Sequence, residues 1–183
     1  PRLIYCSITG YGQTGLYRNK AGHDINYVAL SGIAGHSGRL DNGPPPMGIQ
    51  IADVAGGSLH AVIGILSAVI ERQSSGLGQV IDISMTDCAV TLNNMAAAAV
   101  LAGGEKQQAE SEQLNGGTFY DYYQTSDGRY LSIGSLEPQF MSGLAAILDL
   151  PIRMQKGSSF DPDDRKEVKD AIQAKIAEKT FDH

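Results

Sequence analysis

The sequence predicts an α/β fold, in which part of a parallel-sheet lobe is followed by a smaller α+β lobe. Two observations support this fold class. Short apolar runs at residues 3–8 and 79–85 flank a long apolar stretch at 53–72, and this strand–helix–strand order is typical of neighbouring parallel strands. Beyond a polar segment at 105–114, the pattern changes to a hairpin and two amphipathic helices.

The first lobe should begin with a buried strand that leads into a glycine-rich turn. Residues 3–8 form the strand and residues 9–15 the turn. The apolar run 27–33 predicts a short helix. Residues 35–48 then form a loop of about fourteen residues with three successive prolines, and loops of this length inside a compact domain are usually functional or disordered.

The clearest helical pattern lies at residues 53–72. Its large apolar side chains recur at helical spacings and its other faces are small or apolar, so we expect burial on nearly all sides. These residues are Val54, Leu59, Val62, Ile63, Leu66 and Ile70. The apolar run 59–70 within it is too short to span a bilayer, and no membrane partner is expected. After the strand at 79–85, a second helix is expected at 86–101.

The polar segment 105–114 is interpreted as a linker between two domains, because it is rich in glutamate and glutamine. The first domain then covers residues 1–104, the central part of the large lobe, and the second covers residues 115–183. In the second, the strands 119–124 and 130–133 flank Asp-Gly, a strong signal for a hairpin.

Two helices complete the second domain. An amphipathic pattern predicts one at residues 138–148. Asp161 followed by Pro162 predicts the start of the other, with the aspartate as N-cap and the proline at the first helical position. Its apolar stripe consists of Val168, Ile172 and Ile176.

The overall charge and the cysteine content limit the partners and the compartment. A formal net charge of −6 with no basic stripe argues against nucleic acid as a partner. Cys6 and Cys88 are too few and too far apart for a disulfide framework, so reduced thiols and a cytoplasmic location are expected. No Cys/His spacing suits a metal site. The chain opens directly on a strand, so we expect a fragment of a longer protein.

His23 and Asp24 are the first candidates for catalysis. Taken alone, the pair is more often a helix start, with the aspartate as a cap and the histidine incidental. The functional interpretation is a general base whose ordinary pKa lies near neutrality, able to take and return a carbon-bound proton.

Asp53 and the two glycines that follow form a second candidate. Asp53 stands at a helix start, where a capping role and a catalytic role are compatible. Gly56 and Gly57 cost a helix about 1 kcal/mol each relative to alanine. We therefore expect a close approach to the backbone there, with N–H groups available to an oxyanion.

Three weaker signals remain. The glycines at 10, 12 and 15 match a dinucleotide fingerprint only superficially, because a polar loop and not a helix should follow. Arg18 and Lys20 in that loop are candidate contacts for an anionic ligand. Glu137 precedes the helix at 138–148, and taken alone it is a cap.

Six short motifs occur in order over most of the chain, in the runs 7–15, 21–27, 52–57, 78–82, 116–120 and 134–140. Two of them read Ala21-Gly22-His23-Asp24-Ile25-Asn26-Tyr27 and Ala52-Asp53-Val54-Ala55-Gly56-Gly57. Together they resemble the family III CoA-transferase superfamily, and within it the α-methylacyl-CoA racemases. The resemblance implies that the large lobe binds CoA and that the chain lacks the N-terminal part and the C-terminal end of the whole protein.

The resemblance also implies roles for individual residues. Asp53 matches the acid shared by racemases and transferases, His23 the second acid/base of the racemases, and Glu137 a carboxylate near that histidine. Asp24 and Tyr27 match neighbours of the active site. The implied substrate is an acyl-CoA thioester, with no cofactor besides the coenzyme A of the substrate, and the implied assembly is an interlocked homodimer.

Three functions therefore stay open at this point. In a racemase, His23 and Asp53 would exchange the α-proton of a 2-methylacyl-CoA on opposite faces. In a CoA-transferase, Asp53 would be a nucleophile and His23 would not be needed. In the third case, the isolated segment has no catalytic activity.

Overall fold

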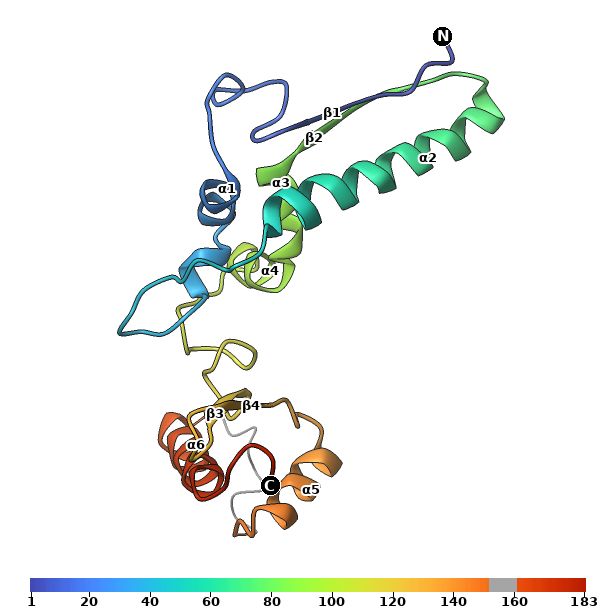
Figure 1. Ribbon diagram of the computed structural model, residues 1–183. Helices are drawn as coiled ribbons and strands as arrows, with labels where there is room; N and C mark the ends of the chain where they lie inside the picture. The colour runs from blue at the N-terminus through green and yellow to red at the C-terminus, as the bar shows by residue number, and fades with distance from the viewer. Residues whose placement is uncertain (152–160) are drawn as a thin grey trace. The chain divides into compact units, whose positions relative to one another are not determined.

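The computed structural model describes residues 1–151 and 161–183. The chain forms two compact units, and each is treated by itself (Figure 1). The first contains Pro1–Gly35 and Pro44–Lys106, and the second contains His36–Gly43 and Gln107–His183. Parallel strands with helices in the first unit confirm the α/β fold class. The domain limits expected at 1–104 and 115–183 stay a prediction.

A parallel pair of strands forms the sheet of the first unit. β1 (Tyr5–Thr9) pairs with β2 (Val80–Ser84), and Tyr5 lies opposite Val80. The helix between them, α2 (His60–Ser75), packs against both strands and runs beside them in Figure 1. The predicted strand–helix–strand unit is therefore confirmed.

The long apolar helix begins as a π-helix. Its first part is η2 (Ile51–Leu59), and α2 continues it without a break until Gly76, which ends it in the left-handed conformation with φ of 74°. Each turn of a π-helix holds an extra residue, and such turns are frequent at functional sites. The helix is longer at both ends than the predicted 53–72.

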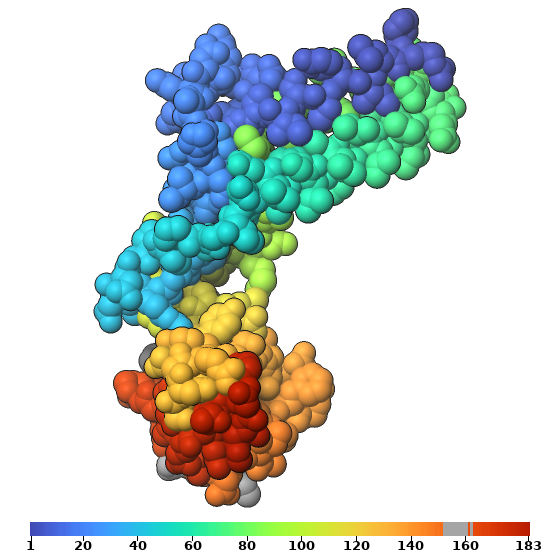
Figure 2. Space-filling model, viewed as in Figure 1, coloured from blue at the N-terminus to red at the C-terminus, as the bar shows by residue number. Residues whose placement is uncertain are grey.

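Burial of this helix on nearly all sides was predicted, and that prediction is wrong. In α2 only two alanines, Ala61 and Ala68, are buried, while the large apolar side chains are exposed. The exposed set is Val62, Ile63, Leu66 and Ile70. Periodicity shows which residues share a face of a helix, but not whether anything covers that face. The open face of α2 is visible along its length in Figure 2.

The same helix is also longer than the apolar run 59–70 that the sequence analysis compared with the thickness of a bilayer. Among the described residues, Ile51–Ser75 is the one helix long and apolar enough to cross a bilayer by length and composition alone. The sequence estimate counted only the run 59–70. The core helix of a soluble protein meets the same criteria of length and composition.

Two short helices replace the single one predicted at 86–101. α3 (Met85–Leu92) and α4 (Asn94–Leu101) are separated by Asn93, whose backbone leaves the helical region. The side-chain amide of Asn93 donates to the carbonyl oxygen of Ser31 at 3.1 Å. This bond ties the break between α3 and α4 to Ser31, the residue that ends the helix α1 (Asp24–Leu30).

α1 (Asp24–Leu30) begins three residues before the predicted helix at 27–33, and the short 3₁₀-helix η1 (Ile33–His36) follows it. Tyr27 is buried, and its ring packs so closely on Gly10 and Gly22 that a Cβ at either would lie 2.5 to 2.7 Å from it. The Tyr11 ring meets it edge-on at 5.2 Å. These two glycines are therefore needed for packing.

The second unit matches the sequence prediction closely. β3 (Asp121–Gln124) and β4 (Tyr130–Ile133) form the expected antiparallel hairpin, with Gly128 in its turn. α5 (Pro138–Ile147) and α6 (Pro162–Ala177) are the two expected helices. The Asp161 carboxylate caps α6 by accepting the N–H of Asp163 at 2.9 Å.

One core holds the second unit together. The predicted stripe of α6 is buried in it with residues of the hairpin, of the segment before it and of α5. The stripe residues are Val168, Ile172 and Ile176, and their neighbours include Phe119, Tyr123 and Met141. Ile172 is completely buried.

Truncation of Ile172 should destabilise the second unit strongly. Ile172→Ala leaves a cavity at a fully buried position, and such changes cost about 2–5 kcal/mol of unfolding free energy. The matched control is Ile147→Ala in the same unit, where the side chain is 83% exposed and the expected change is below about 0.5 kcal/mol. Urea unfolding followed by circular dichroism measures both. Equal unfolding midpoints would contradict the core assignment.

Candidate active site

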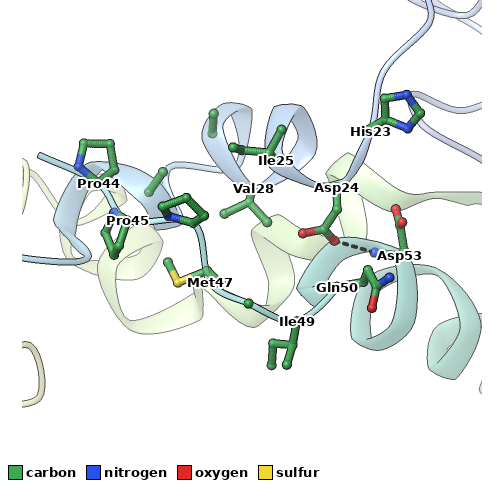
Figure 3. A pocket seen from close by; sticks show the side chains of 14 residues that line it. His23, Asp24, Ile25, Val28, Pro44, Pro45, Met47, Ile49, Gln50 and Asp53 are labelled. Atoms are coloured by element: carbon green, nitrogen blue, oxygen red, sulfur yellow. Dashed lines mark hydrogen bonds between the residues drawn. The ribbon is translucent and has the colours of Figure 1, made fainter.

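The first unit contains a cavity of about 560 Å³. Four segments line it: α1 with the residue before it, η1, the loop after residue 43, and the start of η2 (Figure 3). The lining residues are His23, Asp24, Ile25, Val28, Ala29, Ala34, Pro44, Pro45, Pro46, Met47, Gly48, Ile49, Gln50 and Asp53. The predicted pair His23 and Asp53 therefore borders one cavity.

His23 lies at the N-terminal end of α1. Its backbone is extended, and its N–H donates to the side-chain oxygen of Asn26 at 3.0 Å, which caps the first turn of the helix. The residue as a whole is exposed, so its imidazole is accessible to a ligand. In Figure 3, the carboxylate of Asp53 points toward the side of the cavity on which His23 lies.

Asp24 joins the two helices that form the polar end of the cavity. Its Oδ1 atom accepts the backbone N–H groups of Ala52 at 2.6 Å and of Asp53 at 2.9 Å. The simplest sequence interpretation was a cap on its own helix. Instead, Asp24 caps η2, where the N–H groups at a helix start lack partners within the helix and carry partial positive charge.

Asp53 lies in the first turn of η2, as the prediction of a helix start required. Its side chain is partly exposed, and among the described residues its carboxylate accepts no hydrogen bond. The carboxylate is therefore available to a substrate. Asp24 holds the backbone N–H of Asp53 and so fixes the position from which the carboxylate extends.

Tyr27 lies behind the polar end and does not line the cavity. Burial, together with the nearby Tyr11 and Asp53, raises the pKa of its hydroxyl. Tyr27 is therefore a neutral residue at physiological pH. It supports α1 in the small core that it forms with Val28, Ala52 and Ala89.

The glycine pair in η2 has a packing explanation. A Cβ at Gly56 would lie 3.1 Å from the carbonyl oxygen of Met85, and one at Gly57 would lie 2.9 Å from the Met85 side chain. The close approach predicted at these glycines is thus made by α3. Neither glycine lines the cavity, and their role toward an oxyanion stays a prediction.

Three other candidates lie away from the cavity or cannot be related to it. Arg18 and Lys20 are exposed in the turn that follows Gly15, where no helix forms, and neither lines the cavity. Their contact with an anionic ligand stays a prediction. Glu137 stands at the start of α5 in the second unit, so its proximity to His23 also stays a prediction.

The apolar wall of the cavity was not predicted residue by residue. Ile25 and Val28 contribute from α1, and residues 44–49 contribute from the loop. The unusual length of that loop and its three prolines had marked it as functional or disordered, and this was the one signal available. Among the described residues, no cluster of three or more His, Cys, Asp or Glu side chains could hold a metal ion.

Removal of the Asp24 carboxylate should loosen the start of η2. Asp24→Ala leaves the N–H groups of Ala52 and Asp53 without an acceptor, so their amide exchange should accelerate about tenfold or more, since bonds to charged groups contribute about 1.5–3 kcal/mol. Asp24→Asn keeps an acceptor oxygen and should accelerate exchange less. Amide exchange followed by NMR measures both variants, and unchanged protection in Asp24→Ala would contradict this role.

Comparisons with known proteins agree on one family. The family model described as CoA-transferase family III matches residues 1–183. The chain is 39% identical to the alpha-methylacyl-CoA racemase of Mus musculus over 96% of its length and 37% identical to that of Homo sapiens over 98%. It is 32% identical to the succinyl-CoA:glutarate CoA-transferase of Mus musculus over 97% of its length.

A solved structure shows the same fold. The crystal structure of a CAIB/BAIF family protein from Brucella suis matches 100% of this chain with a TM-score of 0.76 at 29% identity. The chain spans 49% of that protein, 47% of each racemase and 41% of the mouse transferase, which is about half the length of its relatives or less. The match over all 183 residues shows that the chain belongs to CoA-transferase family III.

Proposed function

We propose that the protein containing this chain is an acyl-CoA racemase that interconverts (R)- and (S)-2-methylacyl-CoA thioesters. The observation that carries the proposal is one cavity with His23 and Asp53 at its polar end and an apolar wall beside them. The identity of 37–39% to two proteins named alpha-methylacyl-CoA racemase supports it. Coenzyme A enters as part of the substrate, and the proposal includes the interlocked homodimer and the cytoplasmic location.

The reaction exchanges one proton on two faces of a carbon. A neutral His23 removes the α-proton of the thioester, and the electron pair of the broken C–H bond moves into an enolate. A protonated Asp53 then donates a proton to the opposite face, so the configuration inverts. In the reverse direction Asp53 is the base and His23 the acid, which is why an imidazole and a carboxylate together suit this chemistry.

The enolate needs stabilisation of its negative charge. The positive end of the η2 dipole borders the cavity at Gln50 and Asp53. Gly56 and Gly57, to which the sequence hypothesis assigned this role, do not line the cavity. The N–H groups of Ala52 and Asp53 at the start of η2 already donate to the Asp24 carboxylate, so they are not free to hold the enolate oxygen.

The apolar lining of the cavity indicates which kind of acyl group it can bind. Ile25, Val28, Met47, Ile49 and the prolines offer apolar contact to a branched hydrocarbon. Among the described lining residues there is no lysine or arginine, whereas two carboxylates are present. A dicarboxylate would meet like charges there. The lining thus favours an apolar 2-methylacyl group over the acids that the names of the related transferases mention.

The runner-up is a CoA-transferase, and one comparison favours it. The chain is also 32% identical to a succinyl-CoA:glutarate CoA-transferase. In that chemistry, Asp53 attacks the thioester carbonyl, the C–S bond breaks, and an acyl-enzyme anhydride forms as CoA leaves. His23 has no part in these steps, so the two functions differ in their need for that residue.

Replacement of His23 should suppress proton exchange of the enantiomer whose α-proton His23 removes. In the full-length protein, His23→Ala should lower solvent-deuterium incorporation at C2 of that 2-methylacyl-CoA enantiomer by about 10²–10⁴-fold, the range for general acid–base catalysis. The control is His183→Ala, an exposed histidine outside the cavity, which should keep wild-type exchange. Mass spectrometry of the recovered thioester gives the rates. Wild-type exchange of that enantiomer in His23→Ala would contradict the role assigned to His23.

Hydroxylamine distinguishes the racemase from the transferase. During turnover with acyl-CoA, a racemase should leave Asp53 unlabelled, because its carboxylate forms no anhydride, whereas a transferase would convert it to a hydroxamate. Peptide mass spectrometry of the full-length protein detects the label, and Asp24 in the same cavity is an internal control for non-specific reaction. A hydroxamate on Asp53 alone would overturn the racemase and establish nucleophilic catalysis.

A further inference from the structure

A second histidine of the first unit, His60, lies where η2 ends and α2 begins. It does not line the cavity, and the proposed reaction does not use it. Its imidazole is partly buried, and each of the two ring nitrogens contacts a polar group of the protein. The imidazole is therefore held in place at the junction of the two helices, downstream of Asp53 in the same continuous helix.

The Nδ1 atom of His60 contacts the carbonyl oxygen of Ala55 at 2.8 Å. In the π pattern, this carbonyl would accept the backbone N–H five residues along, which is that of His60 itself. That N–H donates to the carbonyl oxygen of Gly57 instead, so the imidazole takes its place. Because a carbonyl oxygen carries no hydrogen, Nδ1 is the donor, and in a neutral His60 the ring hydrogen lies on Nδ1.

The Nε2 atom of His60 connects the imidazole to α3. It lies 3.2 Å from the hydroxyl oxygen of Thr91, and this oxygen lies 2.7 Å from the carbonyl oxygen of Cys88 in the same helix. In the neutral imidazole Nε2 is an acceptor, so the hydroxyl can direct its one hydrogen to Nε2 or to the carbonyl. The contacts from Ala55 through His60 to Thr91 all lie within the first unit.

The helix α3 also holds η2 at a second point. A Cβ at Gly57 would lie 2.9 Å from the side chain of Met85, and one at Gly56 would lie 3.1 Å from the carbonyl oxygen of Met85. Met85 begins α3, whereas Thr91 lies near its end. Two separate contacts with the same helix oppose rotation of η2 about its own axis.

The form of η2 decides where the Asp53 carboxylate points. This carboxylate has no hydrogen-bond partner among the described residues, so the backbone alone directs it. Conversion of one π turn into an α turn removes one residue from that turn and rotates the preceding residues by about 100°. Asp24 holds the beginning of η2, and His60 holds its end. Both anchors are therefore needed to keep Asp53 in place.

We propose that His60 is a positioning residue for Asp53: by donating to Ala55 and contacting Thr91, it keeps η2 in the π form that directs the Asp53 carboxylate to the cavity. The proposal rests on the proposed racemase function for the role of that carboxylate. His60 does not line the cavity and takes no part in proton transfer. Its loss should therefore slow the step that Asp53 performs and leave the step of His23 intact.

The first measurement needs no activity. Long-range ¹H–¹⁵N NMR spectra of the full-length protein show which ring nitrogen of a neutral histidine carries the hydrogen, and a hydrogen bond selects that nitrogen. The resonances of His60, assigned through His60→Asn, should show the hydrogen on Nδ1. The exposed His183 is the control and should resemble free histidine, which carries it mainly on Nε2. A neutral His60 with its hydrogen on Nε2 would overturn the proposal, because the Ala55 carbonyl cannot donate.

The second measurement uses variants that separate the two ring nitrogens. The amide nitrogen of asparagine lies near the place of Nδ1, so His60→Asn keeps a donor to Ala55. The amide of glutamine lies near the place of Nε2, so His60→Gln loses this bond, and His60→Ala loses both contacts. The matched control is Ser67→Ala, because the Ser67 hydroxyl also bonds a backbone carbonyl, that of Ile63 at 2.8 Å, farther along the same helix.

The readout is deuterium exchange at C2 of the two 2-methylacyl-CoA enantiomers, measured separately with the full-length protein. In His60→Ala, exchange of the enantiomer whose α-proton Asp53 removes should fall about tenfold or more, because misplacement of a reacting group slows the chemical step. Exchange of the enantiomer that His23 deprotonates should stay within about twofold of wild type. His60→Gln should behave like His60→Ala, whereas His60→Asn and Ser67→Ala should behave like wild type.

Three kinetic results would contradict the positioning role. They are an equal loss for both enantiomers in His60→Ala, no loss for either, and a His60→Gln variant as active as His60→Asn. A wild-type protein without exchange of either enantiomer would instead overturn the proposed function. The position of the ring hydrogen would then still decide whether His60 holds η2 through Ala55.

Discussion

The polar end of the cavity depends on one carboxylate that is not itself a proton donor or acceptor in the proposed reaction. Asp24 starts α1 and accepts two backbone N–H groups at the start of η2, twenty-eight and twenty-nine positions along the chain. His23 precedes Asp24, and Asp53 carries one of the two N–H groups. One interaction therefore places two side chains at the same cavity: the imidazole of His23, the residue before Asp24, and the carboxylate of Asp53, whose N–H bonds to Asp24.

The same contact gives the two aspartates at the polar end of the cavity different roles. The charge of Asp24 is satisfied by N–H groups and by the positive end of the η2 dipole, whereas Asp53 has no hydrogen-bond partner among the described residues. One carboxylate therefore serves structure and the other remains available to chemistry.

Local patterns predicted the elements well, and long-range contacts account for what they missed. The hairpin through Asp127-Gly128 and the cap by Asp161 are signals contained within a few residues, and both are confirmed. The role of Asp24 depends on backbone groups that are distant in sequence, so no periodicity reveals it. Gly56 and Gly57 were expected to contact a ligand because glycine destabilises a helix and so needs a reason to be there. The sequence does not show that Met85 occupies the space beside both glycines. The exposed face of α2 was missed for the same reason, since apolar composition does not identify the neighbour that covers it.

The chain passes between the two units three times, before residue 36, after residue 43 and after residue 106. A cut at the last crossing would leave residues 36–43 attached to the first unit at both ends and would remove Glu110 and Asp121, the carboxylates that pair with Arg39. A transplant of residues 1–106 into another protein, or a circular permutation opened at residue 106, would therefore leave the Arg39 guanidinium without these two partners.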